Sequence, residues 1–386
     1  MEPCSRIEIR YSHRIVVSCV SLAIAIILHP WSLASGAIFT WDGNGGDVEW
    51  NTPGNWAGGS VPVGAATTDI VLDGTNNTGT AGTPLDQNII NPILLNSLSF
   101  GAGAGNFFVA GFDLRFGGVN NFITQNSALA QSIANVIRAP NSGLLTITLD
   151  GNGTGLVTLS GDVASGTAGR DYAIVKSGSS TFALTAVNTY GGSTTINGGT
   201  LIAAATSGSA LGSTSSIALN SGGTLALGAS NQIRNAATMT LAGGIFAKGN
   251  FSEGSTSSAG VGTLALTGSN SHLDFGIGSV GTLSFASFAP GTETLLVDNW
   301  TGTANIIGSA STDRLVFAAD QTVNLANFSF TGFEPGAVQF ALGGGFFEIT
   351  PVTVPEPSAI SIAGIAVLVA VTCKRRRWRS LFRGGS

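Results

Sequence analysis

Short runs of alternating apolar and polar residues, each opened by a glycine, recur through the middle of the chain. The tripeptide Gly-Thr-Leu begins four of these runs, at Gly199, Gly223, Gly262 and Gly281. Alternation with a period of two over four to six residues predicts half-buried strands, and the shared opening marks a repeated turn-to-strand corner. Gly199 and Gly223 are 24 residues apart, a spacing typical of solenoid coils, which close a core only by stacking on their neighbours. We therefore predict an all-β solenoid.

Composition supports strands and excludes several other classes of protein. Glycine accounts for 55 of the 386 residues, charged residues make up only 10%, and lysine occurs three times. Such a chain is not a coiled coil, a helical bundle or a basic nucleic-acid-binding protein. Stacked Ser, Thr and Asn can hydrogen-bond along a solenoid, whereas stacked identical charges would repel. With roughly 20 to 25 residues per coil, about 12 to 15 coils are expected.

The N-terminus has the three parts of a secretory signal peptide in order. Basic residues precede an apolar run over 15–28, and small residues follow at 34–37. We predict a signal peptide over 1–36 with cleavage between Gly36 and Ala37. An N-terminal membrane anchor is the alternative.

The C-terminus combines a proline-rich triplet, an apolar segment and a basic cluster. The triplet is Pro355, Glu356 and Pro357, the apolar segment covers 358–373, and the cluster begins with Lys374, Arg375, Arg376 and Arg377. Sixteen helical residues rise about 24 Å, so a short transmembrane helix needs its flanking arginines to snorkel. Because basic residues lie outside both apolar segments, the positive-inside rule places residues 37–354 across the membrane.

This tail resembles a PEP-CTERM sorting signal over residues 351–386. The resemblance implies that an exosortase-type membrane enzyme reads the tail and removes it near the triplet. The two prolines agree with that role, since they keep the segment extended and accessible to a protease. A plain C-terminal anchor is the alternative.

The segment between the termini is acidic and chemically sparse. Residues 37–354 contain seven Lys and Arg against eighteen Asp and Glu, a formal charge of −11, which argues against nucleic-acid partners. All three cysteines lie outside this segment, and His272 is its only histidine. His272 and Asp274 fall on the same face of a predicted strand, and a Ser-His-Asp triad in this segment could use only this histidine. We interpret His272 as an ordinary surface or turn residue.

Residues 174–202 resemble the autotransporter-associated β-strand repeat. Ten positions fit its pattern, and Ser180 and Phe182 depart from it; the fitting residues are Lys176, Gly178, Leu184, Asn188, Thr189, Tyr190, Gly192, Thr194, Gly199 and Leu201. Residues 143–168 and 206–233 look like degenerate neighbouring copies. The resemblance implies a right-handed parallel β-helix of the kind found in exported passenger domains.

These features predict five segments: a signal peptide (1–36), an N-terminal cap and solenoid section (37–142), the repeat region (143–245), a C-terminal solenoid and cap (246–350) and the sorting segment (351–386). Residues 126–138 carry apolar residues at helical spacing, so a short helix there competes with the strand interpretation.

Aromatic residues gather near the predicted ends of the solenoid, with Trp41, Trp50 and Trp56 near its start. Open solenoid ends expose strand edges, so we predict that these residues pack as caps; sugar binding is their alternative role.

The acidic stretches 42–49 and 150–155 fail the EF-hand calcium template and are interpreted as tight turns.

Together these patterns favour a non-enzymatic exported protein of the cell surface or extracellular matrix, structural or adhesive, associated with exopolysaccharide or biofilm. We predict no catalytic, cofactor or metal site. The expected partners are signal peptidase, an exosortase-type enzyme, the inner membrane during transient anchoring, and extracellular polysaccharide. A β-helical polysaccharide-binding or polysaccharide-degrading protein is the alternative.

Overall fold

The computed structural model describes residues 36–167 and 169–353 of the chain. The predicted signal peptide, the predicted transmembrane helix, the Pro355–Glu356–Pro357 triplet and the basic cluster from Lys374 lie outside these residues. Among the described residues, no helix combines the length and the apolar character that crossing a membrane requires.

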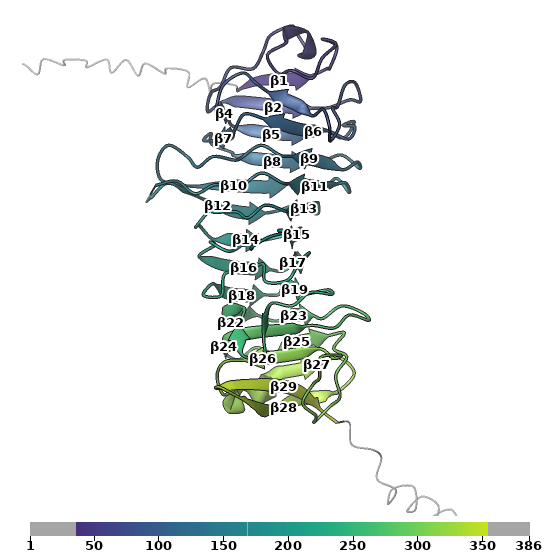
Figure 1. The fold of residues 1–386 in the computed structure, drawn as a ribbon, viewed down its shortest axis with the longest axis vertical. Coiled ribbons are helices and arrows are strands. Elements are labelled where there is room, and N and C mark those ends of the chain that lie inside the picture. The colour runs from purple at the N-terminus through teal and green to yellow at the C-terminus, as the bar shows by residue number, and fades with distance from the viewer. Residues whose placement is uncertain (1–35, 168, 354–386) are drawn as a thin grey trace, which may run out of the picture. The chain divides into compact units, whose positions relative to one another are not determined.

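The larger of two long sheets forms one side of a parallel β-solenoid (Figure 1). Twelve of its strands are parallel, and each comes from the next coil along the chain. They are β1 (Ala37–Trp41), β2 (Thr68–Leu72), β5 (Ser97–Phe100), β8 (Phe122–Gln125), β10 (Leu144–Asp150), β12 (Asp171–Lys176), β14 (Thr194–Ile196), β16 (Ser216–Asn220), β18 (Thr238–Ala242), β22 (Val261–Gly268), β24 (Thr282–Ala289) and β26 (Arg314–Phe317). An antiparallel hairpin, β28 (Glu334–Gly343) and β29 (Phe346–Val352), ends the sheet.

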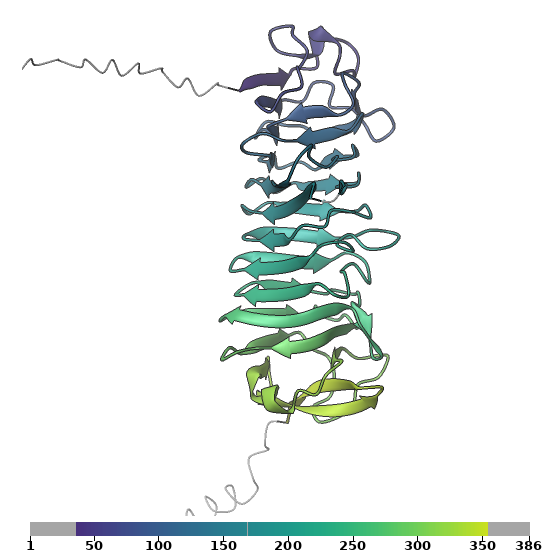
Figure 2. The same ribbon diagram turned by 90° about the vertical axis from the view of Figure 1, so that its left-hand side faces the viewer.

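The second long sheet has 11 parallel strands and forms the opposite side of the coils (Figure 2). Its strands are β3 (Leu85–Gln87), β6 (Phe108–Gly111), β9 (Gln131–Ile133), β11 (Leu156–Leu159), β13 (Thr181–Leu184), β15 (Gly199–Ala203), β17 (Gly223–Leu227), β19 (Ile245–Ala247), β23 (Ser271–Asp274), β25 (Leu295–Asp298) and β27 (Phe328–Phe330). The twelve successive parallel strands of the first sheet bound eleven full turns, just below the 12 to 15 coils expected.

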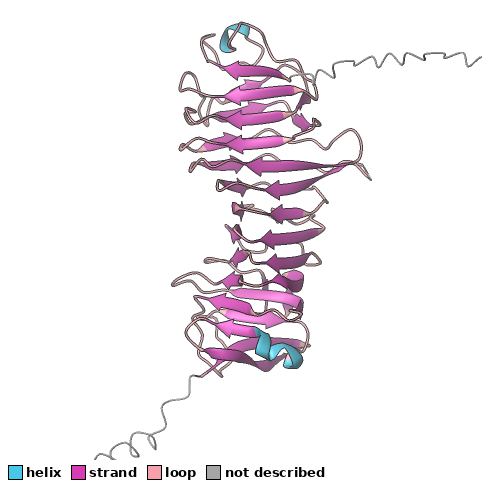
Figure 3. Ribbon diagram, turned by 180° about the vertical axis from the view of Figure 1, so that it is seen from behind, coloured by secondary structure: helices cyan, strands magenta, loops and turns pink. Residues whose placement is uncertain are grey.

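Two short pairs and two short helices complete the described part. β4 (Ile93–Leu95) pairs with β7 (Leu114–Phe116), and β20 (Gly254–Ser255) forms a small hairpin with β21 (Ser258–Ala259). The 3₁₀ helices η1 (Pro53–Asn55) and η2 (Thr322–Asn327) lie toward opposite ends of the solenoid (Figure 3). The prediction of an all-β solenoid is confirmed, and the handedness of the coil stays a prediction.

The 24-residue coil is visible in the register of the second sheet. Gly199 pairs with Gly223, and the Leu that follows each glycine pairs in the same column. The other two Gly-Thr-Leu sequences do not continue this column, because Gly262 lies in β22 and Gly281 precedes β24, both in the first sheet. One tripeptide thus opens strands on both sides of the solenoid.

Apolar side chains fill the interior of the coils in a single continuous core. Strands such as β2 and β17 alternate buried and partly exposed residues, as the period of two predicts. Neighbouring coils place apolar residues directly above one another; Leu201, for example, pairs with Phe182 on one side and Leu225 on the other. Each coil therefore buries its apolar side chains only by packing against the coils on either side.

The predicted short helix over 126–138 is wrong. The segment contains strand β9, and the side chains of Gln131, Ile133, Asn135 and Ile137 are buried at every second position. Leu129, which the helical pattern would have buried, is exposed. Pairing with the coils on both sides overrides the helical spacing of this segment.

The aromatic cap at the N-terminal end is confirmed. Trp41, Trp50 and Trp56 are buried and pack edge to face, with ring centroids 5.2 Å and 5.4 Å apart around Trp56. The indole N–H of Trp56 donates to the carbonyl of Trp50 at 2.7 Å. These rings are packed in the core, so they are not available to stack on a sugar.

Candidate functional site: a hydroxyl-lined groove and the buried charges beside it

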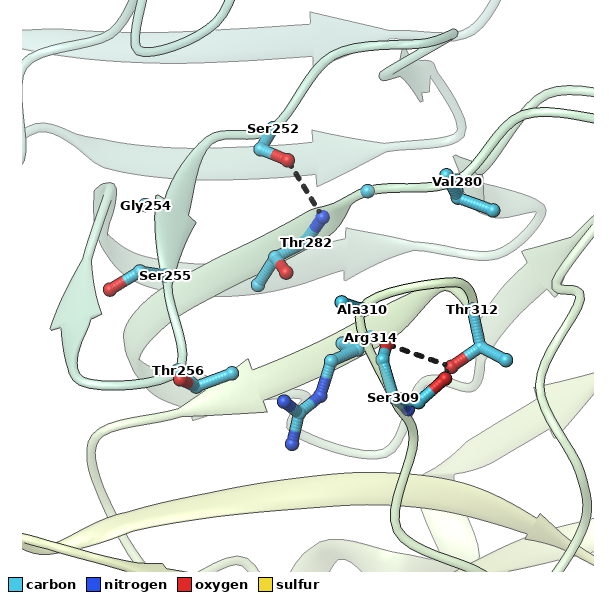
Figure 4. A pocket seen from close by; sticks show the side chains of 11 residues that line it. Ser252, Gly254, Ser255, Thr256, Val280, Thr282, Ser309, Ala310, Thr312 and Arg314 are labelled. Atoms are coloured by element: carbon cyan, nitrogen blue, oxygen red, sulfur yellow. Dashed lines mark hydrogen bonds between the residues drawn. The ribbon is translucent and has the colours of Figure 1, made fainter.

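An open groove lies on the C-terminal half of the solenoid, where three segments far apart in sequence meet (Figure 4). The hairpin β20–β21, the start of strand β24 and the loop 309–312 line a space of about 440 Å³. Small polar residues dominate its walls, and the side chain of Arg314 projects into it between Thr256 and Ser309.

Hydrogen bonds within the walls fix the shape of the groove. Ser252 Oγ accepts the backbone N–H of Thr282 at 3.0 Å and so ties the hairpin segment to β24. On the opposite wall, Thr312 Oγ1 accepts the backbone N–H of Ser309 at 2.8 Å and donates to the Ser309 carbonyl at 3.1 Å. Several hydroxyls are thereby already occupied by the protein itself.

The guanidinium of Arg314 is the cation of the groove. Its Nε donates to Glu348 Oε2 at 3.0 Å, and the Glu348 side chain is fully buried. The other carboxylate oxygen accepts the backbone N–H of Gly308 at 3.0 Å. Because Glu348 neutralises Arg314, the groove has no net positive charge. It offers hydroxyls and oriented N–H donors instead. These groups suit hydrogen bonding to a polyhydroxylated ligand.

A buried ion pair lies beside the floor of this groove. Lys248 Nζ is 2.9 Å from Asp313 Oδ1, and both side chains have no exposed surface. A Cβ built on Gly281, which lines the groove, would lie 3.1 Å from the Lys248 amine. Burial lowers the pKa of Lys248, and the Asp313 carboxylate opposes that effect.

Glu253 is a buried carboxyl next to the hairpin. Its two oxygens accept the backbone N–H groups of Gln232 at 2.8 Å and Ile233 at 3.3 Å, in the preceding coil. Burial raises the pKa of Glu253 to about 8, although the two N–H donors favour the charged form. Glu253 thus closes a coil corner with a buried carboxyl whose pKa lies well above its ordinary value.

The segment that resembles a passenger repeat builds a coil, and its polar residues hold that coil to its neighbours. Asn188 accepts the Val163 backbone N–H at 2.9 Å and donates to the Ala210 carbonyl at 2.9 Å. The Tyr190 hydroxyl hydrogen-bonds Thr194 Oγ1 at 2.7 Å in the interior. The residues matching the repeat pattern therefore have structural roles between coils.

Lys176 of the same segment is fully buried, and no carboxylate of residues 36–167 or 169–353 forms an ion pair with it. Its Nζ donates to the carbonyls of Ser177, Gly178 and Gly198. Gly199, with φ +62°, is the position where a Cβ would collide with this amine and with two carbonyls. Burial lowers the pKa of Lys176 to about 8, and the charge of Asp150 opposes that effect.

His272 does not form a Ser-His-Asp triad with the described residues. Its Nδ1 lies 2.6 Å from Asp298 Oδ2 on strand β25, whereas Asp274 accepts a hydrogen bond from Asn299. Within residues 36–167 and 169–353, no serine hydroxyl hydrogen-bonds the imidazole. The arrangement ties two coils together at a partly exposed position.

The acidic stretch 42–49 forms a turn, and the stretch 150–155 covers the end of β10 and the connection to β11. Asp42 and Asp47 accept backbone N–H groups two residues ahead, at 3.1 Å and 3.0 Å. Over the part of the chain that the structure describes, no group of three His, Cys, Asp or Glu is arranged to hold a metal ion.

Of the predicted processing residues, the structure describes Gly36 and Ala37. Ala37 begins β1 and pairs with Thr68, and a Cβ on Gly36 would collide with the Thr67 carbonyl. The predicted cleavage bond therefore lies at the edge of the first coil.

Sequence reasoning missed the groove and the pair of Lys248 and Asp313, whose members are 65 residues apart, because no local pattern links them.

Comparison with protein families identifies the repeat. Residues 174–203 match the family model described as a Passenger-associated-transport-repeat (PATR). The match confirms the resemblance stated for residues 174–202, and it covers the coil that contains Lys176 and Asn188. No curated protein and no solved structure matches the chain.

Proposed function

We propose that the chain is a non-enzymatic exported protein of the cell surface or extracellular matrix, with a structural or adhesive role. The observation that carries this proposal is the passenger-associated repeat at 174–203, which forms one coil of a long parallel β-solenoid. A continuous core closed by an aromatic cluster at one end and a hairpin at the other suits a rigid spacer outside the cell.

The route of export is proposed from the two ends of the sequence. Residues 1–36 act as a signal peptide cleaved between Gly36 and Ala37, and residues 351–386 act as a PEP-CTERM signal that anchors the chain transiently in the inner membrane. An exosortase-type enzyme then cuts near Pro355, Glu356 and Pro357. The supporting feature is the order of triplet, apolar segment and basic cluster in the sequence.

The surface of the solenoid supports a role outside the cytoplasm. Residues 37–354 have a formal charge of −11, and both of their lysines are buried. Such a surface repels nucleic acid and anionic lipid headgroups, whereas neutral polysaccharide remains a compatible partner.

Polysaccharide binding through the groove is the second candidate function. The hydroxyls and the Arg314 guanidinium that line the groove favour it, since a carbohydrate is recognised through directional hydrogen bonds. Aromatic residues are absent from the described lining, so the proposed affinity is low and depends on many repeated contacts along a polymer.

Fractionation of cells producing the full chain tests the export proposal. We expect a processed form at the surface or in the medium, and retention of the unprocessed form at the membrane when Glu356→Ala disrupts the triplet. Glu334→Ala, an exposed carboxylate in β28, is the matched control and should be exported normally. Cytoplasmic accumulation of the wild-type chain with an intact N-terminus would contradict the proposal.

A further inference from the structure

The pair formed by Lys248 and Asp313 joins two segments at the C-terminal end of the solenoid. Lys248 follows strand β19 of the second sheet, and Asp313 precedes strand β26 of the first. Their 2.9 Å contact is fully enclosed, with no exposed surface on either side chain. An ion pair so completely removed from water loses the hydration of both charges, and this loss favours transfer of the ammonium proton to the carboxylate.

Besides Asp313, the buried amine lies near one aromatic ring, one carbonyl and one hydroxyl. Lys248 Nζ lies 5.3 Å from the centre of the Phe275 ring and donates to the Gly249 carbonyl at 2.9 Å. Ser279 Oγ, at 3.4 Å, gives a hydroxyl within reach of the same nitrogen. A neutral amine held in such a site is a nucleophile, because its lone pair is no longer protonated.

The two carboxylate oxygens of Asp313 have different environments. Oδ2 accepts two hydrogen bonds from Thr301, one from the backbone N–H at 3.1 Å and one from the hydroxyl at 2.8 Å. Oδ1 faces the Lys248 amine and has no aligned hydrogen bond, although it is buried. Two donors on one oxygen stabilise the negative charge that develops there when a nucleophile adds to the carboxyl carbon.

We propose that Lys248 and Asp313 condense to form an intramolecular isopeptide bond. The ammonium proton moves to Oδ1, and the Nζ lone pair then attacks Cγ while the charge on Oδ2 is held by the two Thr301 donors. A second proton passes from Nζ to Oδ1, directly or through the Ser279 hydroxyl. The Cγ–Oδ1 bond breaks, one water leaves, and the Nζ–Cγ amide remains, so the step needs no oxidant, reductant or co-substrate.

The bond would give this end of the solenoid a covalent closure. It encloses residues 249–312 in a loop, and the described residues contain no cysteine that could form a disulfide instead. Both partners are held in place before the reaction by packing and hydrogen bonds, which supplies the proximity that condensation requires.

Lys176 is a matched internal control in the same chain. It is equally buried and also lies near an aromatic ring, with Nζ 5.7 Å from the centre of Phe182. Its hydrogen-bond partners are backbone carbonyls of Ser177, Gly178 and Gly198, and no carboxyl carbon is presented to it as Asp313 is to Lys248. The proposal therefore predicts that Lys176 stays free while Lys248 is acylated.

Tryptic mapping of the denatured full chain tests the proposal. Trypsin cuts after each free lysine, so an unreacted chain gives separate peptides 235–248 and 249–314, ending at Lys248 and Arg314. The isopeptide blocks cleavage after Lys248 and gives one peptide spanning 235–314, lighter than the same peptide without the cross-link by one water, about 18 Da. Cleavage after Lys176 should proceed in the same digest.

A substitution separates the isopeptide from incomplete digestion. In Lys248→Arg the side chain keeps its charge and trypsin still cuts, so the peptide spanning 235–314 should disappear and its two parts should appear. The wild-type map decides the matter even if this variant folds poorly. Peptides 235–248 and 249–314 at their full masses as the sole wild-type products would overturn the proposal and leave Lys248 and Asp313 as a buried ion pair.

Discussion

Replacing Glu253 with glutamine should remove a pH dependence of folding stability that the structure assigns to one carboxyl. Glu253 is 1% exposed, and burial raises its pKa from an ordinary value of 4.5 to about 8. The folded chain therefore holds this proton more tightly than the unfolded chain does. Between about pH 4.5 and pH 8, unfolding releases the proton, so the contribution of Glu253 to stability falls as the pH rises.

The size of the effect follows from the displacement of the pKa. Each pKa unit corresponds to about 1.4 kcal/mol, so the full displacement gives about 5 kcal/mol as an upper limit for the loss between about pH 4.5 and pH 8. The pKa of about 8 already includes the opposing effect of the N–H groups of Gln232 and Ile233, which favour the carboxylate. Glutamine at position 253 keeps one acceptor oxygen and cannot ionise, so the variant should lose stability less steeply with rising pH than the wild type.

Urea denaturation followed by far-UV circular dichroism at about pH 5 and about pH 8 measures this difference. The wild-type transition should move to lower urea at the higher pH, and the Glu253→Gln transition should move much less. Glu334→Gln makes the same chemical change at an exposed position and should follow the wild type. Parallel shifts of wild type and Glu253→Gln would refute the reasoning and mean that the two N–H donors outweigh burial.

Three further predictions concern the packing of the coils. Gly155→Ala should destabilise the chain by about 3 kcal/mol, because its Cβ would lie less than 3.0 Å from the Leu129 carbonyl; Gly82→Ala, where nothing lies within 4 Å, should be nearly neutral in the same urea titration. Trp56→Ala should cost about 3–5 kcal/mol by removing the centre of the aromatic cap, which thermal denaturation would detect as an earlier transition. Lys176 should resist amine-reactive labels in the folded protein and react after denaturation, as mass spectrometry of the labelled chain would show; labelling of the folded chain at Lys176 would place its amine in solvent.

The sequence predicts the solenoid because its signals are local and repeated. The alternation of apolar and polar residues and the 24-residue interval between Gly199 and Gly223 reappear as buried faces and as register in the sheets. The helix expected over 126–138 failed because its apolar spacing fits a helix as well as a strand, and only pairing with neighbouring coils decides between them. A period read from one segment cannot include that pairing energy.

The groove and the buried charges follow from contacts that no local pattern carries. Lys248, Asp313 and Thr301 meet because the 65 residues from Lys248 to Asp313 wind through only about two coils, which stack directly on one another. The sequence shows that lysine is rare, and this rarity is a signal that could have directed attention to Lys176 and Lys248. Its burial, and the carboxylate opposite Lys248, required the fold.

The intact mass of the protein recovered from the cell surface or the medium tests the export proposal most directly. The proposal predicts a mass that matches residues from about 37 to about 355, with the signal peptide and the tail removed. A recovered chain that retains residues 358–386 would show a simple anchor and contradict the sorting route. A chain that also retains residues 1–36 and stays inside the cell would contradict export itself.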